Sequence, residues 1–289
     1  MKRLVLRKML QNKQLFVPCV YDCYSAKVAE MSGYKAALLS GGALSYSLCG
    51  LPDMAFLTSD ELIFATERIA SCTDLPLIVD ADDGYGESPV VVYNTVKRLV
   101  KAGAQAVTID DSTGIRGFER YVAYLASGSQ KPYLQPVVSR KVWLAKIKAA
   151  VEACQGTDCM VIARTEAFSM YSFDEVMERC LGARELGAEM TLICDGMETL
   201  EDAKRVNDLD KGWKMWPDVY SVNGKPNVDL DDIGNLGFNL VTFHVFEKAA
   251  LYGMMLYGKN NAENHSTVFS EAHFENQAPA ELHEFLQKP

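Results

Sequence analysis

The sequence predicts an α/β fold, namely a (β/α)8 barrel of the TIM type, and two observations lead to this prediction. First, four segments share one pattern, in which a helix ends at a glycine and an apolar strand begins two or three residues later. Second, eight apolar strands alternate with helices along the chain. A closed parallel barrel uses eight such units, and its strands are buried on both faces.

The expected strands are short apolar runs. Those that follow the glycine joints lie within residues 32–40, 102–110, 186–194 and 236–244. Further strands are expected at 15–20, 75–79, 160–163 and 214–216. Helices are expected at 26–31, 59–71, 90–101, 140–152, 173–185 and 245–257. Two of them have clear N-terminal signals, because Thr58 and Ser172 precede first turns that contain acidic residues.

The two ends of the chain and one long connection complete the expected organisation, a single domain of residues 1–289. Residues 1–14 are expected to form a short basic helix, since they contain no apolar run long enough for a signal peptide or a membrane span. Residues 111–138 contain several glycines and prolines, and a loop of this length is typical of an active-site lid. Residues 259–289 are expected to form a helical tail outside the barrel.

Composition restricts the class of partner. The chain has 289 residues, of which 48% are hydrophobic, and its formal net charge is −9. The negative charge disfavours nonspecific binding to nucleic acid. We therefore expect a small carboxylate substrate, bound where positive charge is local, and neither nucleic acid nor a membrane. Most of the eight cysteines lie in apolar stretches, which favours reduced thiols and a cytoplasmic protein over a disulfide framework.

The expected strand at 75–79 ends in an acidic turn, Asp80-Ala81-Asp82-Asp83-Gly84. Chemistry in parallel barrels takes place at the carboxyl ends of the strands. Carboxylates this close together repel one another unless a cation binds them, and oxygen ligands suit a hard ion such as Mg²⁺. The alternative is a solvated acidic loop, because short motifs of this kind also occur by chance.

Polar residues follow nearly every expected strand, which core packing explains poorly because buried unpaired charge is costly. Ser40 and the two glycines after it either bind a carboxylate or enolate oxygen or form a plain turn. Arg164 either holds a carboxylate or pairs with Glu166 or a neighbouring aspartate. His244 is either catalytic or structural. The full set is Tyr21-Asp22, Ser40-Gly41-Gly42, Asp80-Ala81-Asp82, Asp110-Asp111, Arg164-Thr165-Glu166, Cys194-Asp195, Trp216-Pro217-Asp218 and His244.

A series of motifs in this order resembles the isocitrate lyase and phosphoenolpyruvate mutase superfamily, from about Val17 to Met255. They are VYDCYSAKVAE, LSGG followed by GLPD, VDADDGYG, TIDD, IARTEAF and GFNLVTFH. The resemblance implies an α/β barrel in which a pyruvate-like substrate arm chelates Mg²⁺. It also implies a homotetramer whose C-terminal helices are exchanged between subunits.

The rim residues and the resemblance together lead to three assignments. The expected metal residues are Asp80, Asp82 and Asp110, the substrate-binding residues are Tyr21, Ser40, Gly41, Gly42 and Arg164, and the catalytic residues are Arg164, His244 and Asp53. The expected cofactor is Mg²⁺, with Mn²⁺ as its substitute. The resemblance implies that the metal acts as a Lewis acid and stabilises an enolate-like transition state.

The loop at 111–138 departs from the lyases of this superfamily. Those that act on isocitrate and 2-methylisocitrate carry a KxCGH motif there, and its cysteine supplies a proton, whereas this loop contains neither Cys nor His. Phosphonate-converting members begin the loop with EDK, where this chain has Asp110-Asp111-Ser112. Oxaloacetate decarboxylases of the superfamily also lack the cysteine and have a histidine near the end of the last strand, where His244 falls.

The sequence therefore predicts a Mg²⁺-dependent lyase for a small 2-oxo or 2-hydroxy dicarboxylate, with oxaloacetate decarboxylation as the leading reaction. Loss of CO₂ from a 2-oxo diacid needs no base to start it and only a later proton donor. Two alternatives stay open. One is mutase or hydrolase chemistry on a phosphonate, suggested by Glu166 and the arginines of the loop. The other is a non-catalytic barrel that binds a metabolite.

Overall fold

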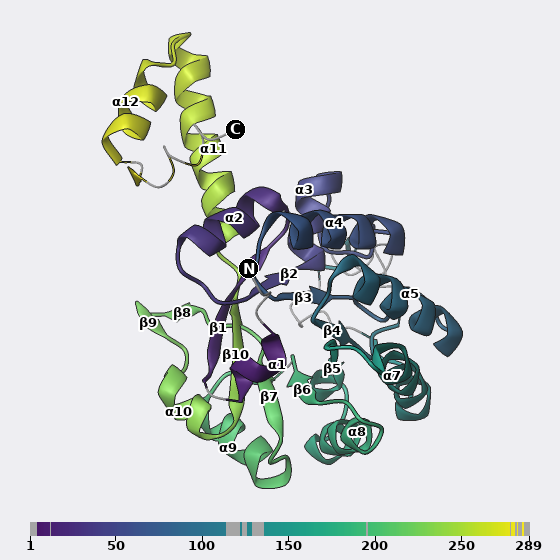
Figure 1. The fold of residues 1–289 in the computed structure, drawn as a ribbon. Helices are drawn as coiled ribbons and strands as arrows, with labels where there is room; N and C mark the ends of the chain where they lie inside the picture. The colour runs from purple at the N-terminus through teal and green to yellow at the C-terminus, as the bar shows by residue number, and fades with distance from the viewer. Residues whose placement is uncertain are drawn as a thin grey trace. The chain divides into compact units, whose positions relative to one another are not determined.

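The computed structural model describes residues 5–11, 13–113, 122, 126–128, 136–194, 196–277, 279, 280, 282 and 285. Eight strands form a closed barrel, in the order β1-β10-β7-β6-β5-β4-β3-β2, and every neighbouring pair is parallel (Figure 1). The predicted fold class is confirmed. The strands are β1 (Leu15–Val20), β2 (Ala37–Leu39), β3 (Leu77–Asp80), β4 (Ala106–Ile109), β5 (Met160–Thr165), β6 (Met190–Ile193), β7 (Trp213–Trp216) and β10 (Phe238–Phe243).

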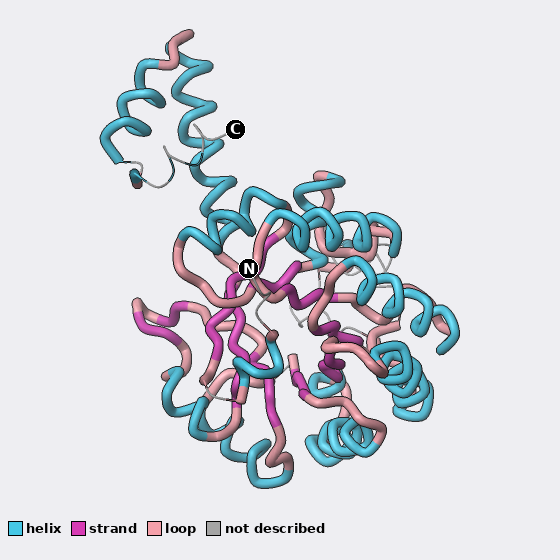
Figure 2. The backbone as a smooth tube through the Cα atoms, in the orientation of Figure 1, coloured by secondary structure: helices cyan, strands magenta, loops and turns pink. Residues whose placement is uncertain are grey.

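Helices surround the strands, as the cyan and magenta segments of Figure 2 show. They are α1 (Leu6–Leu10), α2 (Cys23–Met31), α3 (Gly41–Cys49), α4 (Ser59–Cys72), α5 (Pro89–Ala102), α7 (Arg140–Cys154), η1 (Ala167–Ser169), α8 (Phe173–Glu185), α9 (Leu200–Leu209) and α10 (Leu230–Asn235). The predicted caps are confirmed, since the hydroxyl oxygens of Thr58 and Ser172 accept hydrogen bonds from the N–H groups of Glu61 and Glu175.

Several elements of the barrel region were not predicted, among them η1, α10, two further helices and a hairpin. Residues after Ser40 form the helix α3, although Gly41 and Gly42 are poor helix formers, because the Ser40 hydroxyl caps it and its Ala43 and Leu44 are buried. The helix α9 buries only Ala203 and Val206, so its apolar pattern is weak. A short antiparallel hairpin, β8 (Ser221–Val222) with β9 (Lys225–Pro226), follows β7.

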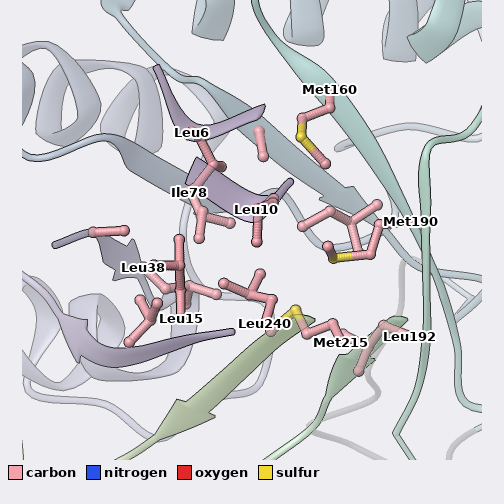
Figure 3. Packing of buried hydrophobic residues seen from close by; sticks show 14 of the residues in the cluster. Leu6, Leu10, Leu15, Leu38, Ile78, Met160, Met190, Leu192, Met215 and Leu240 are labelled. Atoms are coloured by element: carbon pink, nitrogen blue, oxygen red, sulfur yellow. The ribbon is translucent and has the colours of Figure 1, made fainter. Parts of the chain in front are cut away.

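The barrel interior is filled by apolar side chains from all eight strands and from α1 (Figure 3). Leu6 and Leu10 of α1 are buried among the residues of this core, and the Leu6 N–H donates to the side chain of Gln105, just before β4. Each such leucine contributes roughly 1.5–3 kcal/mol by burial. The helix therefore closes the amino-terminal end of the barrel, and the carboxyl ends of the strands remain for polar chemistry.

The chain divides into two compact units, residues 1–244 and 245–289. The second contains α11 (Phe246–Asn264) and α12 (Val268–Gln277). The helix expected at 245–257 is confirmed as α11, but α11 continues to Asn264, so the tail expected from residue 259 begins inside this helix. His265, which follows α11, has a left-handed conformation with φ 49°. In the described part of the chain, no helix is long and apolar enough to cross a membrane.

Candidate active site

The predicted site residues lie at the carboxyl ends of the strands, on one rim of the barrel. Tyr21 follows β1, Ser40 follows β2, Asp80 ends β3 and Asp110 follows β4. Farther around the barrel, Arg164 lies near the end of β5, and Cys194, Asp218 and His244 follow β6, β7 and β10. This placement follows from the parallel order, which brings the same end of every strand to the same side.

The acidic turn after β3 has an unusual backbone. Asp82, Gly84 and Tyr85 have φ values of 45°, 87° and 62°, all in the left-handed region. A non-glycine residue in this region costs on the order of 1 kcal/mol or more, and such strain concentrates at functional sites. The Asp110 N–H donates to the Asp82 carbonyl at 2.8 Å, so the turn is tied to the end of β4.

A buried ion pair holds the same turn from outside the barrel. Lys146 on α7 donates to the Asp83 carboxylate at 2.9 Å and to the Asp83 carbonyl at 3.1 Å. The two side chains are only 1% and 7% exposed. Asp83 also accepts a hydrogen bond from the Tyr85 N–H at 2.9 Å. The Asp83 carboxylate is thus occupied by Lys146 and Tyr85.

Arg164 pairs with two acids at once. Its Nη1 lies 3.1 and 3.0 Å from the two carboxylate oxygens of Asp80, and its Nε lies 2.7 Å from Oε1 of Glu166. Thr108 of β4 donates its hydroxyl to Asp80 at 2.6 Å. Both ion pairs that the sequence left as alternatives to substrate binding are therefore present together.

The charge of Arg164 is stabilised by its surroundings. Burial by itself lowers the pKa of the guanidinium, but the neighbouring Cys194, Glu166, Asp80 and Asp110 raise it by more. The net pKa lies well above the ordinary value, so Arg164 carries a fixed positive charge at the centre of the rim.

The amino terminus of α3 lies against two further acids. A Cβ at Gly42 would lie 3.0 Å from both Cγ and Oδ2 of Asp53, and a Cβ at Gly41 would lie 3.7 Å from Oδ2 of Asp82. The absence of a side chain at Gly42 therefore allows Asp53 to approach the helix. Because the first N–H groups of a helix have no partner inside it, they can bind an anion here.

Asp110 and Asp111 are both fully buried, and they have different partners. Asp110 accepts hydrogen bonds from the N–H of Ser112 at 2.9 Å and from its hydroxyl at 2.6 Å. Asp111 accepts from Thr165, from the Glu166 N–H and from Arg179 of α8, at 2.5, 2.8 and 2.9 Å. Burial raises the pKa of Asp111 to about 6, although these hydrogen bonds and the Arg179 charge lower it.

The two ends of the predicted lid meet near Asp111. Ser112 forms an antiparallel bridge with Val137, and the Val138 N–H donates to the Asp111 carbonyl at 2.8 Å. Arg179 donates to the Val138 carbonyl at 3.0 Å, so the ion pair with Asp111 also anchors the returning end of the loop. Most of the loop, including Arg116, Arg120, Lys131 and Tyr133, lies outside the described residues.

His244 pairs with an acid that was not among the assigned site residues. Its Nδ1 lies 3.4 Å from Oδ2 of Asp218, and both side chains are about one-third exposed, at 35% and 36%. Tyr21 follows β1, which lies beside β10 in the barrel, so Tyr21 and His244 belong to the same part of the rim.

The described contacts link most of the predicted residues into one group. One series of neighbouring residues runs from Asp53 through Gly42 and Gly41 to Asp82 and Asp110. A separate ion pair links Asp80 of β3 to Arg164 of β5. The assignments left out several residues that the structure adds to this site, namely Thr108, Ser112, Glu166, Arg179 and Asp218. Glu166 and Asp218 were visible as polar strand ends, whereas Arg179 lies within a helix and gives no local signal.

The sequence model of one protein family, described as phosphoenolpyruvate phosphomutase, matches residues 6–259 of this chain. The chain belongs to this family. The match covers the barrel and every assigned site residue, and it confirms the resemblance to the phosphoenolpyruvate mutase and isocitrate lyase superfamily.

Curated relatives of this family member are lyases of the superfamily. The chain is 29% identical to 2,3-dimethylmalate lyase of Eubacterium barkeri, over 86% of this chain and 80% of the relative. It is 35% identical to an oxaloacetate decarboxylase of Rhodopseudomonas palustris, over 68% of this chain and 64% of the relative. The chain thus spans slightly less than two thirds of that decarboxylase.

A solved structure of another family member is similar to the structure of this chain. Phosphonopyruvate hydrolase in complex with oxalate and Mg²⁺ has a TM-score of 0.75 and 25% sequence identity, over 91% of this chain and 87% of the hydrolase. The chain is thus similar both to a protein named as a lyase and to one named as a phosphonopyruvate hydrolase.

Proposed function

We propose that this protein is a Mg²⁺-dependent lyase that acts on a small 2-oxo or 2-hydroxy dicarboxylate, and that its reaction is decarboxylation of oxaloacetate. The observation that carries the proposal is the charge of the rim. Asp80 and Glu166 pair with Arg164, and Asp110 lies close enough to influence its charge. Asp53 and Asp82 lie beside the start of α3 on the same rim. Because these acids outnumber the arginine, a dianionic substrate would be repelled from this site unless a cation bound with it.

The residues present fit Mg²⁺. The atoms available are carboxylate oxygens, which are the preferred ligands of this ion. Among the described residues, no three acidic, Cys or His side chains are close enough to hold an ion by themselves. This agrees with Mg²⁺, which keeps several waters and takes few protein ligands besides the substrate. We expect Asp80, Asp82 and Asp110 to surround the ion, with some of these contacts made through its bound waters and with Asp80 still paired with Arg164. When bound, Mg²⁺ supplies Lewis-acid stabilisation of negative charge on the substrate oxygen.

The side chains of the rim account for binding and orientation. The free N–H groups at the start of α3, at Gly41 and Gly42, suit the substrate carboxylate, with Ser40 as their cap. Arg164 is held by Asp80 and Glu166 in one position, so its charge is fixed before the substrate arrives. Tyr21 and Asp53 lie at the edges of this arrangement, and we expect them to orient the substrate.

Decarboxylation agrees with the polar residues of the rim and with the absence of Cys and His from the sequence of the loop at 111–138. Breaking the bond to CO₂ leaves the electron pair on the remaining pyruvate unit as an enolate, and no base is needed for that step. The enolate must then receive a proton at carbon. His244 is oriented by Asp218, and we propose that it donates this proton.

The direct test is to incubate the purified protein with oxaloacetate and Mg²⁺ and to measure pyruvate. We expect pyruvate to form well above the rate with Mg²⁺ alone, and chelation by EDTA to return the rate to background. An unchanged rate in the presence of the protein would rule out the decarboxylase proposal. Tight binding of oxalate without turnover of any 2-oxo acid would instead favour the non-catalytic alternative.

Replacing His244 tests the proton donor. The His244→Gln variant is expected to lower kcat about 10²-fold or more with little change in KM, because general acid catalysis contributes on this scale and the carboxylate contacts remain. The matched variant Asp218→Asn should show a smaller loss, since it removes only the partner that orients the ring. If kcat is unchanged in both variants, the proton comes from another group.

Phosphonate chemistry is the second candidate, and the pairing of Glu166 with Arg164 favours it. The fixed arginine suits a phosphonate oxygen, and the glutamate beside it suits the group that attacks phosphorus. Phosphorus NMR of the protein with Mg²⁺ and phosphonopyruvate distinguishes the two functions. New phosphorus signals would favour this candidate, and an unchanged spectrum would exclude it.

We also propose the homotetramer that the family resemblance implies. In support, none of the residues of α11 is buried, and its Leu251, Tyr252, Met254 and Met255 are 55%, 70%, 66% and 48% exposed. Apolar surface of this kind is typical of interfaces. Sedimentation should give the mass of four chains. The double variant Leu251→Glu with Met255→Glu should give smaller species, whereas the control Lys248→Glu should not. A monomeric wild-type protein would contradict the proposal.

A further inference from the structure

Two cysteines from different helices meet beside the barrel. Cys23 is the first residue of α2, and Cys72 is the last residue of α4. The Cys72 sulfur lies 3.9 Å from the Cys23 carbonyl oxygen, which places the two cysteines side by side. The same region is tied together at Glu30, whose carboxylate accepts from the hydroxyl of Thr73 at 3.0 Å. The contact between the cysteines thus belongs to a well-packed helix pair.

The accessibility of this pair distinguishes it from a second one. Cys23 and Cys72 are both partly exposed, so a small oxidant can reach them. Cys154 and Cys159 also influence each other's pKa, but they are only 7% and 3% exposed. A bond between Cys154 and Cys159 would close a very short segment, whereas a bond between Cys23 and Cys72 would join two helices far apart in sequence.

The two thiols have complementary chemistry. Cys23 lies at the amino terminus of α2. Burial raises the pKa of Cys72 to about 12, and its interaction with Cys23 adds to this effect. Because the Cys72 thiol resists ionisation, Cys72 is suited to act second.

We propose that Cys23 and Cys72 form a reversible disulfide that fastens α2 to α4, with a low-molecular-weight disulfide as the oxidant. The Cys23 thiolate attacks one sulfur of glutathione disulfide, and one glutathione thiolate leaves. Cys72 then loses its proton and attacks the Cys23 sulfur, which releases the second glutathione. The protein is oxidised by two electrons, the oxidant is reduced by two, and both protein protons pass to the two glutathione products.

The position of the bond gives it a structural consequence. Cys23 follows Asp22, which caps α2 by accepting a hydrogen bond from Ser25, and Tyr21 of the rim precedes the cap. Fastening Cys23 to α4 would therefore fix the joint between β1 and α2. A crosslink over this sequence separation mainly restricts the unfolded chain, so it should raise thermal stability.

The test equilibrates the full-length protein with graded ratios of glutathione and glutathione disulfide. Acid then stops the exchange, and the free thiols are alkylated with N-ethylmaleimide in denaturant at neutral pH. Peptide mass spectrometry should identify a crosslink between the peptides of Cys23 and Cys72 at lower oxidant ratios than any other crosslink. The melting temperature should rise by about 5 to 10 °C on oxidation and return on reduction.

Two variants separate this proposal from general oxidation. Cys72→Ser should lose the rise in melting temperature and accumulate glutathione on Cys23. Cys49→Ser, which changes another partly exposed cysteine, should behave as the wild type. The proposal is overturned if Cys23 and Cys72 remain alkylated across all ratios, or if Cys154 and Cys159 crosslink first. Because the crosslink is mapped in the unmodified protein, a variant that fails to fold does not affect this conclusion.

Discussion

The Asp82→Asn variant is expected to lower Mg²⁺-dependent turnover by at least about 10³-fold, because it removes a carboxylate charge where the transition state is stabilised. Asp82 lies beside the amino terminus of α3, and its carbonyl accepts from Asp110. Its side chain is therefore close to both the proposed carboxylate site and the proposed metal residues. Asp83 cannot replace it, since its carboxylate is buried and paired with Lys146.

Asparagine is the informative replacement at this position. Asp82 has φ 45°, and asparagine tolerates the left-handed region about as well as aspartate does. The backbone of the turn should therefore survive, and the melting temperature should change little. Alanine would add backbone strain to the loss of charge and would confuse the two effects.

Activity and metal affinity should be measured separately. Titration calorimetry should show weaker Mg²⁺ binding in Asp82→Asn, in parallel with the loss of turnover. The control is Glu87→Gln, which removes an exposed carboxylate five residues further along the same loop and should retain both properties. Full activity in Asp82→Asn, or activity that survives chelation, would refute the metal mechanism.

The Arg179→Met variant is expected to lower the free energy of unfolding by about 3–5 kcal/mol, the usual effect of removing one partner of a buried ion pair. Arg179 and Asp111 are 1% and 0% exposed, and their contact is 2.9 Å long. Without Arg179, the Asp111 carboxylate stays buried with only Thr165 and the Glu166 N–H as donors. The Val138 carbonyl also loses its hydrogen bond.

The neighbouring Arg140 provides the control. It forms ion pairs with Glu175 and Glu178 at the start of α7 and α8, but its side chain is 37% exposed. Exposed pairs contribute about 0–1 kcal/mol, so Arg140→Met should unfold at nearly the same urea concentration as the wild type. Equal losses in Arg140→Met and Arg179→Met would show that burial of the Asp111 pair is not the cause.

A double variant tests whether the uncompensated charge of Asp111 causes the loss of stability. Removing both charges with Asp111→Asn and Arg179→Met leaves no uncompensated ion in the interior. We expect this variant to be more stable than Arg179→Met alone. If the two losses simply add, the ion pair does not account for the effect of Arg179.

Much of the barrel could be predicted because its signals are local. The run at 15–20 agrees with β1, and the helix at 173–185 agrees with α8, because apolar periodicity and capping residues act within one element. The prediction failed where such signals are weak. The helix α3 begins with two glycines, and its stability depends on the Ser40 cap and on burial against the barrel.

The candidate site also combines features that local sequence predicts with contacts that it does not predict. The residues of the rim could be listed from strand ends alone, because parallel strands bring those ends together. Their partners could not be listed. Lys146 lies 63 residues from Asp83, and Arg179 lies 68 residues from Asp111, each in the middle of a helix where nothing in the local sequence indicates a buried charge. Asp218 was visible as a polar strand end, but its contact with His244 was not, because only the pairing of β7 with β10 brings the two side chains together.

The sequence by itself determined the family, the barrel and the set of polar residues at one rim, since motif order and periodicity are properties of neighbouring residues. Only the tertiary structure decided what each carboxylate contacts. Asp80, Asp82 and Asp83 are nearly adjacent and chemically alike, yet one pairs with Arg164, one lies beside α3 and one is buried with Lys146. The physical reason is that the ionic interactions of a carboxylate depend on its distance to charges supplied by other elements, which the fold alone sets.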